Sequence, residues 1–180
     1  MSISRHRLKD GSEAVIRPIA PSDQERLKRS FEHLGADSRY RRFLGAKASL
    51  NDRELAYFTD VDHHDHEALV AEQSTTGDIL GLARFVRSER SSSVAEVGIA
   101  VVDYAQRQGL GRALLARLAS RAREEGVTRF TGVTLVGNAA TRALFRELGP
   151  TVTRNVGSGT TKLAVNLTAD HAVGELARAA

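Results

Sequence analysis

The sequence of 180 residues contains no cysteine. This absence excludes disulfide bonds, thiolate zinc sites and a cysteine nucleophile, and it fits a reducing compartment. No apolar run approaches the ~20 residues that a membrane-spanning helix needs. Residues 1–8 carry charges without the apolar segment of a signal peptide. We therefore expect a soluble, cytoplasmic protein that engages no membrane.

Aromatic residues and excess charge are also scarce. Aromatic side chains make up 5% of the chain, and 26 basic against 22 acidic residues leave a net charge of only +4. Nucleic-acid-binding surfaces usually combine strong positive charge with aromatic platforms for the bases. The composition therefore does not predict a nucleic-acid partner.

Hydrophobic patterning predicts one α+β domain over residues 1–180, with a core at about 13–167 and a tail at 168–180. Three successive apolar strands indicate an antiparallel meander, within a mixed, mostly antiparallel sheet flanked by helices. The expected strands are 13–19, 67–72, 79–86, 94–102, 130–136, 151–155 and 160–167. The expected helices are 21–34, 39–44, 52–58 with Asn51 and Glu54 as a capping box, 109–125, 138–148 and, in the tail, 170–180.

A glycine-containing loop at 106–112 follows one of these strands and opens the longest helix. Its glycines allow a tight turn and close approach of a ligand to the backbone. Free amides at a helix N-terminus bind anions, and Arg107 and Arg112 add positive charge. The pattern predicts a pyrophosphate site, although a plain strand-to-helix turn is the alternative. The third glycine of a dinucleotide-binding fingerprint and the lysine of a P-loop are absent.

This loop, Gln106-x-x-Gly109-x-Gly111, resembles the Q/R-x-x-G-x-G/A element of the GNAT superfamily of acyl-CoA-dependent N-acyltransferases. Residues 138–150 resemble the family's N-x-x-A-x-x-L-Y-x-x-x-G-F. The resemblance spans about residues 13–167 and implies the GNAT fold, acetyl-CoA as co-substrate and no metal. The implied acetyl-CoA contacts are Ile99, Val101, Gln106, Arg107, Gln108, Gly109, Leu110, Gly111, Arg112, Asn138 and Phe145.

The sequence departs from this family pattern at Phe145, where many relatives carry a tyrosine. That tyrosine is often proposed to protonate the departing CoA thiolate, and a phenyl ring has no proton to give. We expect Phe145 to pack beside the cofactor or within the core. A water, or direct expulsion of the thiolate, would then replace the acid.

Glu96 is the expected catalytic base. Strand alternation places Val94, Glu96, Gly98, Ala100 and Val102 on one face, and the small residues leave room beside the carboxylate. An ammonium substrate must lose a proton before its nitrogen attacks a thioester, and a carboxylate can accept that proton. A surface or salt-bridged glutamate is the alternative.

A closer resemblance favours the catalytic role. Residues 95–101 resemble the Ala-Glu-hydrophobic strand of bacterial protein lysine acetyltransferases of the Pat type, whose base is that glutamate. Segments 16–23, 34–43 and 61–71 resemble other parts of the same proteins. The resemblance implies that a protein lysine is the acceptor. We expect the chain to act as a monomer or homodimer. Acetylation of a small amine and a non-catalytic acyl-CoA-binding module remain alternatives. The sensing or synthetase-like domain often fused to those proteins is not expected within 180 residues.

Two charged clusters have less specific interpretations. Residues 60–67 contain three histidines and four acidic residues, which are metal-ligand types. Consecutive ligands in a loop seldom converge on one metal, so we expect a solvated loop, with a substrate-facing wall as the alternative and no metal. Arg39, Arg41 and Arg42 are expected to form a solvated helix face, with a site for acidic substrates as the alternative.

Overall fold

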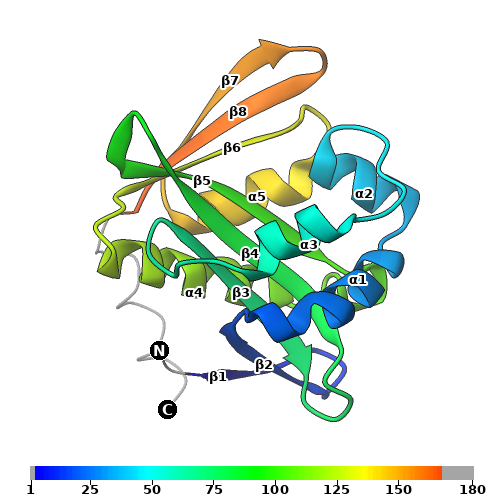
Figure 1. The fold of residues 1–180 in the computed structure, drawn as a ribbon. Coiled ribbons are helices and arrows are strands. Elements are labelled where there is room, and N and C mark those ends of the chain that lie inside the picture. Colours follow the sequence, from blue (N-terminus) through cyan, green and yellow to red (C-terminus); the bar gives the residue numbers. More distant parts are fainter. Residues whose placement is uncertain (1–2, 168–180) are drawn as a thin grey trace.

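The structure, a computed structural model, describes residues 3–167. In this part of the chain eight strands form one sheet in the order β1-β2-β3-β4-β5-β6-β8-β7 (Figure 1). Every neighbouring pair is antiparallel except β5 and β6, which are parallel. The predicted α+β fold with a mixed, mostly antiparallel sheet is confirmed, and so is the meander of β3, β4 and β5.

The strands are β1 (Ser4–Arg7), β2 (Glu13–Pro18), β3 (His66–Gln73), β4 (Ile79–Ser88), β5 (Ser91–Val101), β6 (Arg129–Leu135), β7 (Thr151–Gly157) and β8 (Thr160–Asn166). The α-helices are α1 (Gln24–Glu32), α2 (Ala36–Phe43), α3 (Asp52–Thr59), α4 (Leu110–Glu124) and α5 (Ala139–Leu148). Two short 3₁₀ helices, Pro21–Asp23 and Asp103–Ala105, complete the regular structure. Within residues 3–167 no helix is long and apolar enough to cross a membrane.

Local sequence signals explain several of these boundaries. The predicted capping box of α3 is confirmed, because Asn51 accepts a hydrogen bond from the Glu54 amide and Glu54 accepts one from the Asn51 amide. Helix α4 ends where Gly126 adopts a left-handed backbone, with φ of 78°.

The structure differs from the sequence-based expectation in two elements. Strand β1 was not expected, because Ser-Arg-His-Arg offers no apolar alternation; it pairs at the sheet edge with β2. Helix α2 starts at Ala36 rather than at residue 39, with Gly35 as its N-cap residue, and α1 already ends at Glu32, before the glycine that was expected to end it. The helix expected at 170–180 lies outside the described residues.

Helices cover both faces of the sheet. Helices α1, α2 and α3 lie on one face, and α4 and α5 lie on the other (Figure 1). Strand β3 supplies both cores by alternation: Leu69 packs in the α4 cluster and Val70 in the α1–α3 cluster. Leu114 and Leu118 of α4 are fully buried against this sheet. The two apolar layers hold the sheet from both sides.

The parallel strands β5 and β6 pair over only three residues and then separate. Their register runs from Val94 opposite Arg129 to Glu96 opposite Thr131. Beyond this point β5 remains paired with β4, and β6 remains paired with β8. The sheet is therefore continuous up to Glu96 and open beyond it.

Candidate active site

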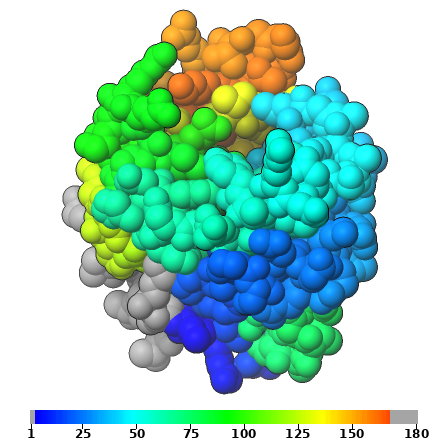
Figure 2. Space-filling view, in the orientation of Figure 1, coloured from blue at the N-terminus to red at the C-terminus, as the bar shows by residue number. Residues whose placement is uncertain are grey.

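A cavity of about 690 Å³ lies where the sheet opens. Segments from α2, α3, β4, β5, β6, α5 and β8 line it, and we call it the Glu96 cavity. The space-filling view shows the surface hollowed between the cyan α2–α3 segment and the orange β7–β8 hairpin (Figure 2). Both the opened edge of β5 and that of β6 are accessible from this space.

Glu96 lies at the point where the two strands part. Its Cα partners are Val86 on β4 and Thr131 on β6, and its side chain is exposed within the cavity lining. The carboxylate forms no hydrogen bond or ion pair with any residue between 3 and 167. No salt bridge of Glu96 is present in the described part of the chain, and its role as catalytic base rather than surface glutamate stays a prediction.

The prediction that alternate residues from 94 to 102 share one face of β5 can be compared with their positions in the structure. Val94, Glu96 and Gly98 line the cavity, and Ala100 packs against the α1–α3 cluster. Val102 follows the end of β5 at Val101; it is buried, belongs to the α4 cluster and also lines, with Ala100, a small apolar cavity beside α1.

Two arginines lie close to Glu96. The Arg42 guanidinium covers Gly98, since a Cβ on that glycine would lie 2.7 Å from Arg42 Nη2. Arg84, whose Cα partner is Gly98, lies with its guanidinium 4.8 Å from the centres of both the Tyr57 and Phe58 rings. Burial and the neighbouring Arg84 charge lower the pKa of Arg42 to about 10, while Glu96 acts in the opposite direction.

Arg39 has a different role from Arg41 and Arg42. It donates to the carbonyl oxygens of Leu34, Ala48 and Glu32, and its guanidinium lies 4.7 Å from the centre of the Phe31 ring. Arg39 therefore fixes the loops around α2, whereas Arg41 and Arg42 line the Glu96 cavity.

The predicted anion-binding loop lies beyond the C-terminal end of β5, outside the lining of the cavity. Gly109 precedes α4 with φ of 87°, and no side chain caps the helix N-terminus. The amides in the first turn of a helix have no helical acceptor, and an N-terminus without a side-chain cap is the arrangement that binds anions. The Leu110 side chain is 1% exposed and packs in the core, so only its amide is available. A Cβ on Gly111 would make ordinary contacts with Leu144, Ile99 and Val101.

The Gln106 side chain braces this loop against α2. Its amide nitrogen donates to Ser38 Oγ at 3.2 Å, Val101 O at 3.0 Å and Asp103 Oδ1 at 3.1 Å. Asp103 also accepts the Gly35 amide at 3.1 Å. Gln106 therefore holds the loop in place, and its contact with acetyl-CoA stays a prediction.

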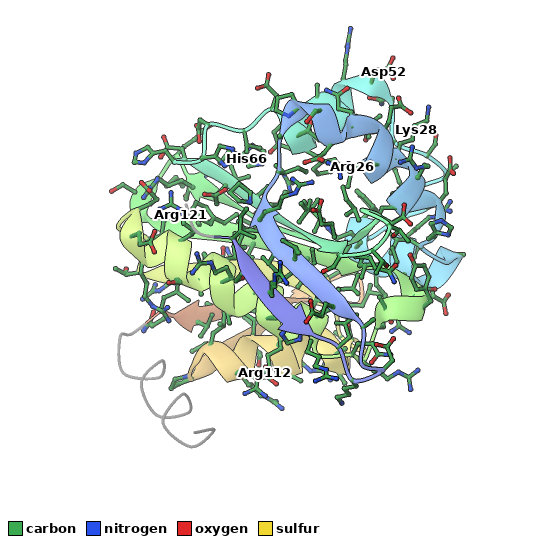
Figure 3. The ribbon with its side chains drawn as sticks, turned by 90° about the horizontal axis from the view of Figure 1, so that it is seen from below. Arg26, Lys28, Asp52, His66, Arg112 and Arg121 are labelled. Carbon is green, nitrogen blue, oxygen red and sulfur yellow. The ribbon has the colours of Figure 1, made fainter. Side chains whose placement is uncertain are left out.

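The charged members of the loop differ in their surroundings. Arg107 is exposed with φ of 59°, and Gln108 is half-buried. Arg112 is bound across to α5, with its Nε 3.2 Å from Glu147 Oε2 (Figure 3). On the α4 face of β5, Val101 and Ile99 pack against the core, and Ile99 also lines the cavity.

Helix α5 supplies one wall of the cavity. Asn138 caps this helix by accepting a hydrogen bond from the Thr141 amide at 3.2 Å. Phe145 is 2% exposed, and its Cζ is 3.0 Å from the position of a Cβ on Gly132, so the glycine makes room for the ring. The buried Thr134 hydroxyl lines the same cavity and has no hydrogen-bond partner among the described residues.

Residues 60–65 form the expected exposed loop, but Glu67, at the start of strand β3 after that loop, makes a buried contact with α4. Glu67 is fully buried and accepts from Arg121 Nε at 3.1 Å, while His63 Nδ1 lies 2.7 Å from its other oxygen. Arg121 also pairs with Glu125 (Arg121 is labelled in Figure 3). We call Glu67, His63, Arg121 and Glu125 the α4 clasp. Residues 3–167 contain no group of side chains that could hold a metal ion.

His66 contacts two residues of the cavity lining, Tyr57 and Arg84, but is not part of that lining, and a substrate-facing role for residues 60–67 stays a prediction. Its ring lies 5.0 Å from the Tyr57 ring, and Arg84 Nη1 is 3.3 Å from its Nε2. Burial and the Arg84 charge lower its pKa.

Sequence reasoning missed several side chains that line the cavity. These are Tyr57, Arg84, Thr131, Thr134 and Lys162. Their positions depend on which strands pair and in which register, and no local motif marks that. The alternation of polar and apolar residues along β4 and β8 was the only available signal.

Comparisons with known proteins agree on one family. The model of the acetyltransferase (GNAT) family matches residues 27–149, more than half of the chain. The acetyltransferase Pat of Mycolicibacterium smegmatis is 32% identical over 143 residues, which cover 79% of this chain and 43% of that protein. The chain thus spans less than half the length of this relative.

Solved structures show the same fold. The GNAT domain of S. lividans PAT superposes with a TM-score of 0.83 at 29% identity, covering 92% of this chain and 97% of that one. YncA from Salmonella typhimurium, solved with acetyl-CoA, has a TM-score of 0.69 at 24% identity and covers 88% of this chain and 96% of that one.

Proposed function

The chain belongs to the acetyltransferase (GNAT) family, and we propose that this acetyl-CoA-dependent N-acetyltransferase acts on lysine side chains of proteins, with Glu96 as general base. Similarity to the Pat acetyltransferase and to the GNAT domain of S. lividans PAT supports the choice of acceptor. Transfer from thioester to amine needs no covalent enzyme intermediate, because oriented binding of both partners supplies much of the rate.

The observation that carries the proposal is the position of Glu96 at the end of the β5–β6 pairing. The carboxylate is exposed to a cavity large enough for a side chain and a thioester arm. It has no ion-pair partner among residues 3–167, so it is available to accept a proton.

The chain offers two features that fit acetyl-CoA. The uncapped amides at the start of α4, after Gly109, suit the pyrophosphate. The unpaired edge of β5 beyond Glu96 suits the polar groups of the pantetheine arm. These features lie along one path, from the C-terminal end of β5 back toward Glu96.

The proposed chemistry requires one proton transfer before attack. Glu96 takes a proton from the acceptor ammonium, directly or through water, and the neutral nitrogen then attacks the thioester carbonyl carbon. The carbon–sulfur bond breaks, and the sulfur leaves with the electron pair as CoA thiolate. Phe145 cannot protonate that thiolate, and the Thr134 hydroxyl is the protic group that we assign to stabilise it by hydrogen bonding.

The experiment is acetyl transfer to amines measured in two ways. Release of CoA thiol is followed with acetyl-CoA and lysine-containing proteins, and mass spectrometry identifies the acetylated residue. Glu96→Gln is compared with Glu32→Gln, which changes an exposed glutamate on α1 outside the cavity. We expect acetyl-lysine with wild type and Glu32→Gln, and a loss on the order of 10²-fold with Glu96→Gln. Turnover of small amines only, or binding of acetyl-CoA without any release of thiol, would contradict the proposal.

A further inference from the structure

The Glu96 cavity is lined by many cations and one carboxylate. The basic residues in its lining are Arg41, Arg42, Arg84, Arg87, Arg90 and Lys162. Among residues 3–167, Glu96 is the only acidic residue in that lining. An acceptor amine that reaches Glu96 must therefore pass through a region of positive potential, which repels a lone ammonium.

These cations are not all equally available. Arg87 is engaged by the protein: its Nε lies 2.6 Å from Asp65 Oδ1, and its Nη2 donates to the Glu125 carbonyl oxygen at 2.8 Å. In contrast, Arg41, Arg42, Arg90 and Lys162 form no ion pair with any acidic residue between 3 and 167. Arg84 contacts His66, Tyr57 and Phe58, and Arg42 is largely buried beside Glu96, so the exposed cations of the lining are Arg41, Arg90 and Lys162.

Sheet register places two of the cations on either side of Glu96. On β4, Arg84 is opposite Gly98, two residues from Glu96 and on the same face. On β8, Lys162 is opposite Val133, two residues beyond Thr131, the Cα partner of Glu96. Arg84 and Lys162 therefore project from the same sheet face as Glu96 and flank it across the opening.

Two of these cations, Arg90 and Lys162, also lie away from the pyrophosphate loop. Arg90 is in the turn that precedes β5, and the loop around Gly109 follows the other end of that strand. Lys162 is on β8, across the opening from β5. Neither position is next to the uncapped start of α4, so these charges are not part of the expected pyrophosphate site.

We propose that the cavity selects a lysine whose neighbours in the substrate protein are aspartates or glutamates. This proposal rests on the proposed lysine acetyltransferase function and names its substrate class. The acceptor lysine meets Glu96, while the flanking carboxylates pair with the cations around it. Guanidinium groups suit this role because they bind carboxylates with two parallel hydrogen bonds.

The test uses three synthetic peptides with one central lysine. Their flanking residues are Asp and Glu, Asn and Gln, or Arg, in otherwise identical sequences. We expect kcat/KM to be highest for the acidic peptide, by on the order of tenfold over the neutral one at low salt, and this preference to shrink as salt is added. A kcat/KM that is equal for acidic and neutral peptides would overturn the proposal and leave the proposed function intact. If no peptide or protein lysine is acetylated, both fail.

A variant pair identifies the residues responsible. Arg90→Gln combined with Lys162→Gln removes two exposed side chains and should cut the preference for the acidic peptide several-fold without changing the KM for acetyl-CoA. Arg146→Gln, an exposed arginine on α5 outside the cavity lining, is the matched control and should leave the preference unchanged. If the double variant instead raises the KM for acetyl-CoA and keeps the peptide preference, the cations serve the donor phosphates and the proposal is wrong.

Discussion

The α4 clasp and the Glu96 cavity use the same residue types in opposite ways. In the clasp, Glu67 is fully buried and accepts from both His63 and Arg121. In the cavity, Glu96 is exposed and has no such partner among the described residues. Charges that are paired inside the protein hold its elements together, whereas charges left open are available to a substrate.

Strand alternation explains why two glutamates of one sheet differ so much. Glu67 is opposite Phe85, whose partner on β5 is Val97, so all three face α4. Glu96, one residue away from Val97, faces the other side. A carboxylate on the α4 face must be paired because helix α4 covers it, while the sheet opening leaves Glu96 accessible.

The largest expected effect is on stability and concerns the clasp. Glu67→Ala removes one partner of a buried ion pair and should lower the free energy of unfolding by roughly 3 kcal/mol, the lower end for such a loss. We expect the lower end of that range because Arg121 would still form ion pairs with Glu124 and Glu125. Urea unfolding gives the value. Glu124→Gln changes a carboxylate that is 56% exposed and should cost less than about 1 kcal/mol. Equal losses in the two variants would contradict the distinction between clasp and surface.

The next effect is on catalysis and should leave stability unchanged. Glu96→Gln should lower kcat with a lysine substrate by roughly 10²-fold, the usual range for a general base, without weakening acetyl-CoA binding. The loss should shrink as pH rises toward the lysine pKa of ~10.4, because the free amine then forms without help. The measurement is kcat at saturating amine across pH, with urea unfolding beside it. Wild-type kcat with only a raised KM would make Glu96 a binding residue.

Sequence alone located the parts of the site that are local and missed those that depend on strand pairing. Glu96 and the loop from Gln106 to Arg112 are each marked by neighbours in the chain, so strand alternation, glycine spacing and the family resemblance made them candidates, and their roles stay predictions. Arg84 and Lys162 flank Glu96 only because β4 and β8 adopt particular registers, and a one-residue slip would turn them to the other face. The buried pairing of Glu67 was likewise invisible, since its partner Arg121 lies 54 positions along the chain.

A third prediction compares the two ends of α4. This helix runs from the pyrophosphate loop to the α4 clasp. Gly109 and Gly126 both have positive φ, 87° and 78°, so an alanine at either position costs about 1–2 kcal/mol of backbone strain. At Gly109 the new Cβ would also lie 3.3 Å from His6 Nε2, whereas at Gly126 nothing lies within 4 Å. Calorimetry should show roughly tenfold weaker acetyl-CoA binding for Gly109→Ala, about 1.4 kcal/mol, and unchanged binding for Gly126→Ala. Unchanged binding in both folded variants would remove the loop from the donor site.

The smallest expected effect is at Phe145, on the α5 wall of the cavity. The ring is almost fully buried and Gly132 accommodates it, so its place in the structure is explained by packing. Phe145→Tyr adds a hydroxyl at the ring tip, beside the point where β5 and β6 separate. If the thiolate leaves with the help of the Thr134 hydroxyl or of water, the new phenol should change kcat by only a few-fold. A gain on the order of 10²-fold, the lower range for general acid catalysis, would show that a missing acid limits this enzyme.

Thr134→Val is the informative companion variant, because it keeps the shape of the side chain and removes the hydroxyl. We expect a lower kcat with unchanged stability. An unchanged kcat in both variants would mean that neither side chain assists the departing sulfur.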